Sequence, residues 1–166
     1  MAFKLFVVLV AVGIPMMVQG YSSGAPAEEC STMTPRHGVE PQTGPSPYDI
    51  ILDKNNIRAG ETVGITIRGR SNDDTFKGLL VQARVGDTPI GSFDVSPSRQ
   101  YIQTLSCGNG RNNAVTHKKI DQGVHEVKLY WIAPSKLAER VNFYFTVAKN
   151  GGVFWVAQKS ETLNVK

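Results

Sequence analysis

The segment "FKGLLVQARVG" at residues 76–86 alternates in the way expected of a β-strand with two unlike faces. One face is wholly apolar and consists of Leu79, Val81, Ala83 and Val85. The other face is mixed and consists of Phe76, Gly78, Leu80, Gln82 and Arg84. Strands that are buried on both faces are nearly continuous apolar runs, so Gln82 and Arg84 argue against such a position. We therefore expect the apolar face to cover a core and the mixed face to meet water or a partner.

Further segments of similar length carry strand signals, and polar turns separate them. They are residues 48–53, 61–69, 89–95, 100–107, 125–133, 140–148 and 152–158. No segment carries a convincing helical stripe, and residues 133–142 predict at most a short helical turn beside Pro134. About eight short strands joined by polar turns predict an all-β fold, an immunoglobulin-like antiparallel β-sandwich. An eight-stranded barrel is the alternative, and composition does not separate the two.

Two of these segments also predict which large side chains fill the core. Val127, Leu129 and Trp131 share one face of residues 125–133. On residues 140–148 the corresponding face consists of Val141, Phe143, Phe145 and Val147. We expect both faces, including Trp131 and Phe143, to be buried.

Residues 1–20 predict a secretory signal peptide rather than part of the fold. Lys4 precedes the apolar run "LFVVLVAVGIPMMV", which ends in the small-residue sequence "VQG". The run is shorter than the roughly 20 residues that span a bilayer, so a transmembrane segment is not expected. Cleavage after Gly20 leaves a single domain, residues 21–166, and lowers the net charge from +4 to +3 because Lys4 is removed. The remaining charges are scattered, and no basic arm predicts a nucleic-acid partner.

Residues 21–47 are rich in Pro, Gly, Ser and Thr, which predicts an extended, irregular lead-in. The lead-in contains one of the two cysteines, Cys30, and the other is Cys107. In an oxidising compartment such a pair forms one disulfide, worth roughly 4 kcal/mol on the loop-entropy model. A metal site is the weaker alternative because the chain has no CxxC motif. We expect the disulfide to tie the lead-in to the domain.

The sequence predicts no catalytic, metal or cofactor site. The three histidines, His37, His117 and His125, lie in the lead-in, at a loop edge and at a strand start, where a lone histidine is more often a hydrogen-bonding surface group than a ligand. There is no G-x-S-x-G nucleophile elbow, and the adjacent acids Asp73 and Asp74 read as turn residues. We therefore expect a binding protein rather than an enzyme.

Basic side chains supply the candidate binding groups. Arg68 and Arg70 end one predicted strand. The candidate ligand-binding residues are Lys77, Arg84, Arg111, Lys118 and Lys119. Arg and Lys hold phosphate through charge-assisted hydrogen bonds, although solvated strand faces carry such charges without any ligand.

Several sequence motifs, taken in order, resemble a known family. They are "YSSGAP" at residues 21–26, Cys30, "FKGLLVQAR", "SCGNGRNNAVTH" at 106–117, "LYWIAP" at 129–134 and "VNFYFTVAKNGGVFW" at 141–155. In this order and spacing they resemble a reeler domain, and a reeler domain alone after a signal peptide is similar to small insect defence proteins of the noduler type.

The resemblance implies an immunoglobulin-like sandwich, secretion into haemolymph and a role in innate immunity. Its expected partners are microbial surface polymers, such as lipopolysaccharide and wall polymers, and haemocytes that form nodules. It supplies no catalytic residues. An extracellular matrix or adhesion module is the alternative function, because reeler domains also occur in larger matrix proteins.

Overall fold

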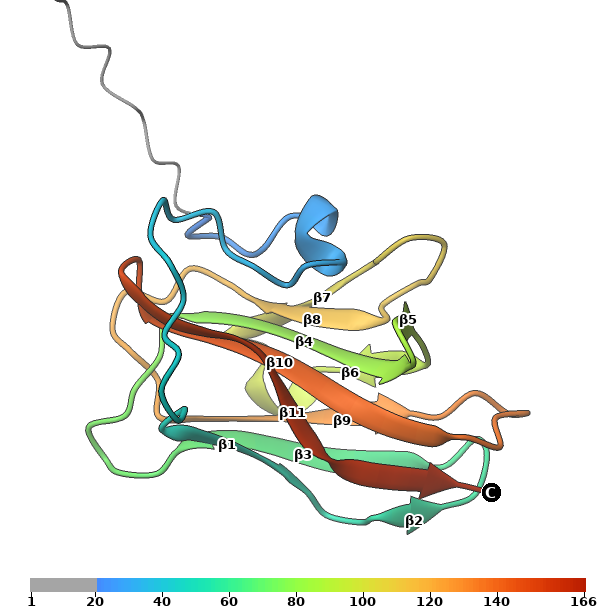
Figure 1. Ribbon diagram of the computed structural model, residues 1–166. Coiled ribbons are helices and arrows are strands. Elements are labelled where there is room, and N and C mark those ends of the chain that lie inside the picture. Colours follow the sequence, from blue (N-terminus) through green and yellow to red (C-terminus); the bar gives the residue numbers. More distant parts are fainter. Residues whose placement is uncertain (1–20) are drawn as a thin grey trace, which may run out of the picture.

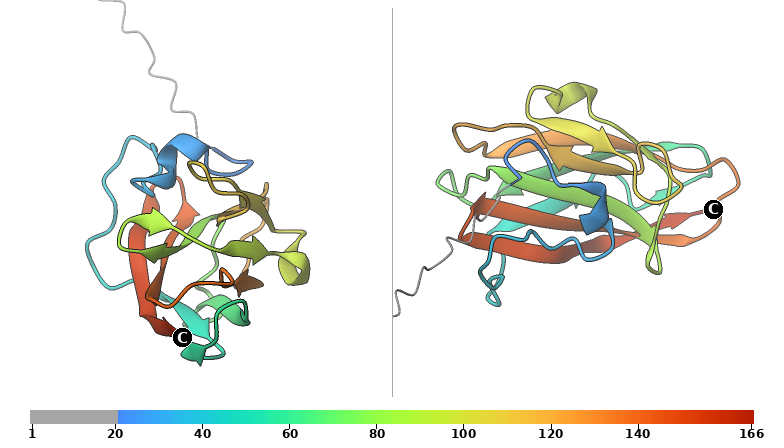
Figure 2. Two further views of the ribbon diagram at one scale, coloured as in Figure 1. Left: turned by 90° about the vertical axis from the view of Figure 1, so that its right-hand side faces the viewer. Right: turned by 90° about the horizontal axis from the view of Figure 1, so that it is seen from above.

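The computed structural model describes residues 21–166 (Figure 1). The signal-peptide prediction concerns residues 1–20, which lie outside this range. Within it, two β-sheets pack face to face as a sandwich (Figure 2). The predicted all-β sandwich is therefore confirmed, and the barrel alternative is wrong because the strands form two separate sheets.

The smaller sheet has four strands in the order β1-β3-β9-β6. Their bounds are β1 (Tyr48–Leu52), β3 (Thr62–Gly69), β9 (Glu126–Ile132) and β6 (Ser92–Asp94). Neighbouring strands pair antiparallel throughout this sheet.

The larger sheet has the order β2-β11-β10-β4-β8-β7, and the short β5 pairs with β4. Its strands are β2 (Asn56–Ile57), β4 (Gly78–Val85), β5 (Thr88–Pro89), β7 (Ile102–Leu105), β8 (Ala114–His117), β10 (Arg140–Asn150) and β11 (Val153–Val165). Its pairs are antiparallel except for β2 and β11, which run parallel.

The structure adds strands that the sequence pattern did not predict. β2 and β5 have two residues each, too few for any periodicity to be seen. β8 is longer, but Ala114, Val115 and Thr116 are all buried, so it has no alternation between polar and apolar positions. Residues 133–142 form no helix; the helical elements in residues 21–166 are two 3₁₀ turns, Ala27–Cys30 and Ser96–Ser98.

The core lies between the two sheets, where the predicted apolar faces meet. Val127, Leu129 and Trp131 point inward from β9, as predicted. The predicted face of β10 is buried too, and Phe143 packs edge-to-face on Trp131 with 5.5 Å between ring centroids. The apolar face of β4 belongs to the same core.

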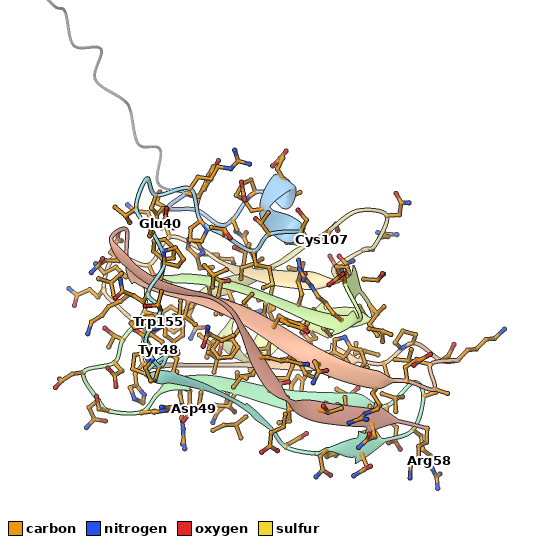
Figure 3. All side chains as sticks on the ribbon, viewed as in Figure 1. Glu40, Tyr48, Asp49, Arg58, Cys107 and Trp155 are labelled. Atoms are coloured by element: carbon orange, nitrogen blue, oxygen red, sulfur yellow. A yellow bond between two sulfur atoms is a disulfide. The ribbon has the colours of Figure 1, made fainter. Side chains whose placement is uncertain are left out.

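The edges of the two sheets approach each other where β11 begins. Trp155 of β11 packs edge-to-face on Tyr48 of β1, with 5.7 Å between ring centroids (Figure 3). Burial raises the pKa of Tyr48 to about 12, and its hydroxyl donates a 2.8 Å hydrogen bond to the carbonyl of Thr75. This contact closes one side of the sandwich beneath the lead-in.

The lead-in, residues 21–47, crosses the face of the larger sheet that points away from the core, here called the outer face (Figures 1 and 2). It is irregular apart from the 3₁₀ turn Ala27–Cys30, as predicted. The predicted disulfide between Cys30 and Cys107 is confirmed, with 5.7 Å between the Cα atoms. The sandwich thus carries a third, partial layer.

Candidate functional site

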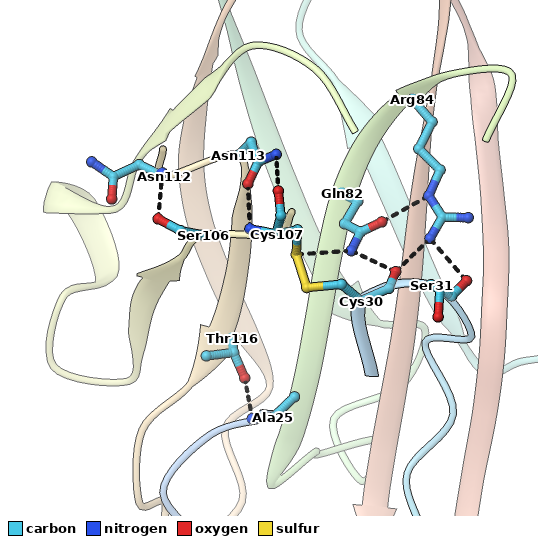
Figure 4. Close-up of a disulfide and its surroundings, with 10 residues drawn as sticks. All are labelled: Ala25, Cys30, Ser31, Gln82, Arg84, Ser106, Cys107, Asn112, Asn113 and Thr116. Carbon is cyan, nitrogen blue, oxygen red and sulfur yellow. Dashed lines mark hydrogen bonds between the residues drawn. A yellow bond between two sulfur atoms is a disulfide. The ribbon is translucent and has the colours of Figure 1, made fainter. Parts of the chain in front are cut away.

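The mixed face of β4 points away from the core between the sheets, as predicted, but the lead-in covers it, so the expectation that it is open to water or a partner is wrong. Gln82 is 0% exposed and Arg84 is 8% exposed. Both donate to the carbonyl oxygen of Cys30, over 2.9 Å from Gln82 Nε2 and 2.8 Å from Arg84 Nη2 (Figure 4). Arg84 Nε also donates to Gln82 Oε1 over 2.7 Å. These polar side chains satisfy the carbonyls of Cys30 and Ser31, which lie at the end of the 3₁₀ turn.

Arg84 therefore serves the fold and is not exposed to an external ligand. Its guanidinium lies 5.3 Å from the ring centroid of Tyr144, and burial lowers its pKa while the charge of Asp87 opposes the shift. Gln82 Nε2 also contacts Cys107 Sγ at 3.3 Å, so Gln82 packs beside the disulfide. The guanidinium of Arg84 donates hydrogen bonds to groups within the protein.

Two further contacts hold the lead-in at the level of Leu80, nearer the start of β4. Thr146 Oγ1 donates to the carbonyl of Met33 over 2.7 Å and accepts from the amide of Ala157 over 3.0 Å. Met33 is buried with φ of 55°, a backbone conformation in which few non-glycine residues are found. The amide of Ala25 donates to Thr116 Oγ1 over 2.7 Å (Figure 4). The lead-in is thus attached to β4, β8 and β10.

Between these attachments the lead-in and the sheet border a half-open cavity of about 270 Å³. Its apolar walls include Ala25, Pro26, Met33 and Pro35 from the lead-in and Leu80 and Ala148 from the sheet. Gly78 permits the close approach of β4 and β10, since a Cβ there would lie 2.9 Å from the Cβ of Ala148. Small residues on both strands therefore leave space beneath the lead-in.

Polar groups stand at the border of this cavity. His117 Nε2 donates to the carbonyl of Tyr21 over 2.9 Å, so its Nδ1 accepts from the amide of Leu79 over 3.2 Å. Lys77 lines the cavity, is exposed, and donates from Nζ to the carbonyl of Asp121 over 2.8 Å. The cavity therefore has an apolar interior and a cationic border.

His37 contributes the most unusual polar group of the cavity wall. Its Nδ1 is buried and has no hydrogen-bond partner among residues 21–166, and its ring lies 5.4 Å from that of Phe154. Burial lowers the pKa of His37 below 6.5, and the proximity of His117 lowers it further, while the carbonyl of Gly151 opposes the shift. The site therefore favours the neutral imidazole.

The structure brings together three of the predicted basic residues. The pairing of Leu80 with Thr116 places the start of β4 beside the end of β8, so Lys77 lies at the same end of the sheet as Lys118 and Lys119. Arg111 lies in the β7–β8 loop at the opposite end of β8. The predicted set therefore does not form one patch.

Arg99 joins these lysines, and sequence reasoning missed it. Lys118 Nζ donates to the carbonyl of Arg99 over 2.7 Å, and Arg99 is exposed. Lys119 Nζ lies 3.3 Å from Asp121 Oδ1. We call Lys77, Arg99, Lys118 and Lys119 the basic cluster. The sequence around Arg99 does not identify it, because Arg99 reaches the lysines only through the packing of the segment after β6 against Lys118.

The remaining candidate residues lie elsewhere. Arg68 is exposed on the smaller sheet, and Arg70 is paired with Asp49 at 2.8 Å. Asp74 accepts hydrogen bonds from the hydroxyl and amide of Ser71, which lower its pKa, as befits a turn residue. Within residues 21–166 no group of three or more His, Cys, Asp and Glu side chains is placed to hold a metal ion.

A second hollow of about 770 Å³ opens between β1 and β11. Its border mixes Asp49, Lys54, Lys159 and Glu161, so it presents no single sign of charge. The cavity beneath the lead-in, with the basic cluster beside it, is the stronger candidate site.

A β-sandwich whose outer face carries a disulfide-linked N-terminal segment places the chain in a class of extracellular-type β modules. The family model described as "Reeler domain" matches residues 28–166. The chain therefore belongs to the reeler family.

Solved structures agree on the fold. The Reelin-N domain of F-spondin superposes with a TM-score of 0.63 at 15% sequence identity, over 79% of this chain and 94% of that one. Within residues 21–166 no helix is long and apolar enough to cross a membrane.

Relatives with curated names include insect proteins of the same length class. "Putative defense protein Hdd11" of Hyphantria cunea is 39% identical over 88% of this chain and 89% of that protein. "Defense protein l(2)34Fc" of Drosophila melanogaster is 32% identical over 99% of both. Human "Ferric-chelate reductase 1" is 33% identical, but the match spans only 23% of that protein. The relatives that match over most of their own length carry defence names.

Proposed function

We propose that this protein is a secreted insect defence protein that binds anionic components of microbial surfaces, such as lipopolysaccharide and wall polymers, and so promotes antimicrobial defence or haemocyte nodulation. Full-length relatives named as defence proteins support the role. The predicted signal peptide and the Cys30–Cys107 disulfide support secretion into the haemolymph.

The basic cluster is the observation that carries the binding part of the proposal. Lys77 and Lys118 each donate to one backbone carbonyl, and Lys119 is paired with the carboxylate of Asp121. An ammonium group has three donors, so each retains donors for a ligand. Phosphate groups on microbial polymers are suited to such donors through charge-assisted hydrogen bonds. Arg99 extends the cluster on the exposed surface.

The test is lipopolysaccharide binding by the Lys77→Gln, Lys118→Gln, Lys119→Gln triple variant across a salt series. The matched control is Arg58→Gln, Lys136→Gln, Arg140→Gln, which removes the same charge at exposed positions outside the cluster. We expect the cluster variant to bind about tenfold more weakly and the control to bind nearly as the wild type does. Wild-type binding should weaken with salt, because the screening length falls from about 10 Å at 0.1 M to about 3 Å at 1 M.

Two results would contradict the proposal. One is an absence of binding to whole bacteria, fungi, lipopolysaccharide and wall polymers. The other is equal loss in the cluster and control variants, which would mean that only net charge matters. Binding to haemocytes or matrix without any microbial ligand would favour the adhesion alternative.

A further inference from the structure

We propose that the cavity beneath the lead-in binds one acyl chain of an anionic amphiphile, and that Lys77 holds the headgroup at its border. The inference deepens the proposed function by naming the part of the microbial ligand that is buried, and it rests on that function for the source of the ligand. The argument depends on the size of the cavity, its lining and the charge beside it.

The size of the cavity suits part of a ligand. Pockets for whole drug-sized molecules measure roughly 300–1,000 Å³. The volume of about 270 Å³ is below that range. A single aliphatic chain fills such a space, while its headgroup and the rest of the molecule remain outside.

The lining favours hydrocarbon over sugar. Leu80 and Ala148 form the floor, and Met33, Pro26 and Pro35 form the cover. The nearby polar groups of Thr146 and Thr116 are occupied by Met33 and Ala25 of the lead-in. His37 Nδ1 is the buried polar atom of the wall without a partner among residues 21–166. A sugar, with several hydroxyls to satisfy, would therefore find too few free partners there, whereas hydrocarbon needs none.

The charge beside the cavity selects the headgroup. Lys77 lines the cavity and is exposed, and Lys118 and Lys119 lie at the same end of the sheet. Glu29 also lines the cavity, but it is buried and paired with Arg36, and it accepts from Thr32 over 2.9 Å. Asp121 is paired with Lys119 and offsets one of the three lysine charges. The formal charge at the border is therefore still positive, which complements a phosphate or carboxylate.

The first experiment measures the affinity of wild-type protein for alkyl phosphates of increasing chain length, below the concentration at which they form micelles. Each added methylene should strengthen binding by up to about fourfold, the factor for transfer of one methylene from water, until the cavity is full. Beyond that length the affinity should level off. Affinity that rises without a plateau, or that does not depend on chain length, would overturn the proposal.

The second experiment blocks the cavity. Ala25→Phe places a large side chain at a lining position of the lead-in, and Ala27→Phe is the matched control at an exposed position outside the lining. We expect the first variant to bind dodecyl phosphate at least tenfold more weakly and the second to bind it as the wild type does. Equal binding by all three proteins would overturn the proposal.

A direct measurement covers the case in which Ala25→Phe displaces the lead-in. In wild-type protein, nuclear Overhauser effects should connect the methylenes of bound dodecyl phosphate with the methyl groups of Leu80, Met33 and Ala148. Contacts with other methyl groups, and none with these, would overturn the proposal whatever the variant does.

The headgroup is tested separately. Lys77→Gln should weaken dodecyl phosphate binding about fivefold, while Lys149→Gln, at an exposed position outside the lining, should leave it unchanged. Dodecyltrimethylammonium, with the same chain and the opposite charge, should bind more weakly than the phosphate. Equal binding of both amphiphiles would overturn the role of Lys77.

Comparing intact and deacylated lipopolysaccharide separates this inference from the proposed function. Weaker binding of the deacylated form, with the difference abolished by Ala25→Phe, supports the cavity. If both forms bind equally well, the proposed function stands and the acyl-chain inference fails. If neither binds but dodecyl phosphate does, the cavity is real and the microbial ligand is wrong.

Discussion

The two faces of β4 are both covered, but by different kinds of structure. The inner face packs Leu79, Val81 and Ala83 into a continuous apolar core between two sheets. The outer face uses Gln82 and Arg84 to hold the carbonyl of Cys30 in an irregular segment. The inner face is covered through extensive apolar contact, whereas the outer face is covered by a segment held through individual hydrogen bonds. The cavity lies under the outer cover, because a segment fixed at separate points does not fill the space between them.

This difference implies that the sandwich and the lead-in should lose their structure separately. The sandwich core should govern global stability, whereas the attachments of the lead-in should govern the outer layer and the cavity. The predictions below follow this division from the largest expected effect to the smallest.

The largest effect is expected from Phe143→Ala in the core. Phe143 is fully buried and packs on Trp131, so its removal should lower the free energy of unfolding by about 3–5 kcal/mol. Urea denaturation measures this loss. Tyr130→Ala, at an exposed aromatic of β9, should cost far less. A similar small loss in both variants would mean that the core assignment is wrong.

The next effect is expected from removing the disulfide with Cys30→Ala and Cys107→Ala. The bridge spans a sequence separation of 77, for which loop entropy gives roughly 4 kcal/mol; measured values are typically 2–4 kcal/mol. In this variant, amide exchange should become faster in residues 21–47 by a much larger factor than in β3 and β9. Uniform acceleration across both layers would contradict the division of the molecule into two layers.

A smaller effect is expected from Arg84→Met, which keeps most of the side-chain volume and removes the donors. The carbonyl of Cys30 then keeps only the hydrogen bond from Gln82, and that of Ser31 loses its 3.4 Å contact. The expected cost is about 1–3 kcal/mol. Arg68→Met, an exposed arginine on β3, should stay within about 0.5 kcal/mol of wild type. Equal losses of stability in the two variants would mean that Arg84 does not help to hold the lead-in on the sheet.

The sequence predicted those strands of the sandwich that have one buried face and one exposed face. On β9, buried Leu129 and Trp131 alternate with exposed Lys128 and Tyr130, which makes the period visible. On β8 the same signal is missing because the lead-in and the core bury both faces. The eight predicted segments were found, and the extra strands are short or doubly covered.

The outer layer was harder to predict because its partners are far apart in the chain. Arg84 meets Cys30 across a separation of 54 residues, so its local sequence resembles that of a solvent-exposed strand. The disulfide could be predicted because the chain has only two cysteines. The cavity could not, since it depends on Gly78 and Ala148 meeting across two strands. Of the candidate basic residues, Lys77, Lys118 and Lys119 lie at one end of the larger sheet, and their separation from Arg111 follows from the strand register, which the sequence does not show.

The smallest effect concerns pH and His37, which packs the lead-in against Phe154. Because burial holds its pKa below 6.5 in the folded protein, the unfolded chain binds the proton first as the pH falls. The contribution of His37 to stability is therefore complete above about pH 6.5 and is lost progressively below it. Between about pH 7.5 and 5.5 the melting temperature of the wild type should fall more than that of His37→Gln, which does not titrate. Asp74 does not disturb the comparison, since hydrogen bonds from Ser71 lower its pKa below 3.8 and both proteins share it. Parallel curves for the two proteins would mean that His37 is as well solvated in the folded state as in the unfolded state, and that the lead-in does not bury its ring.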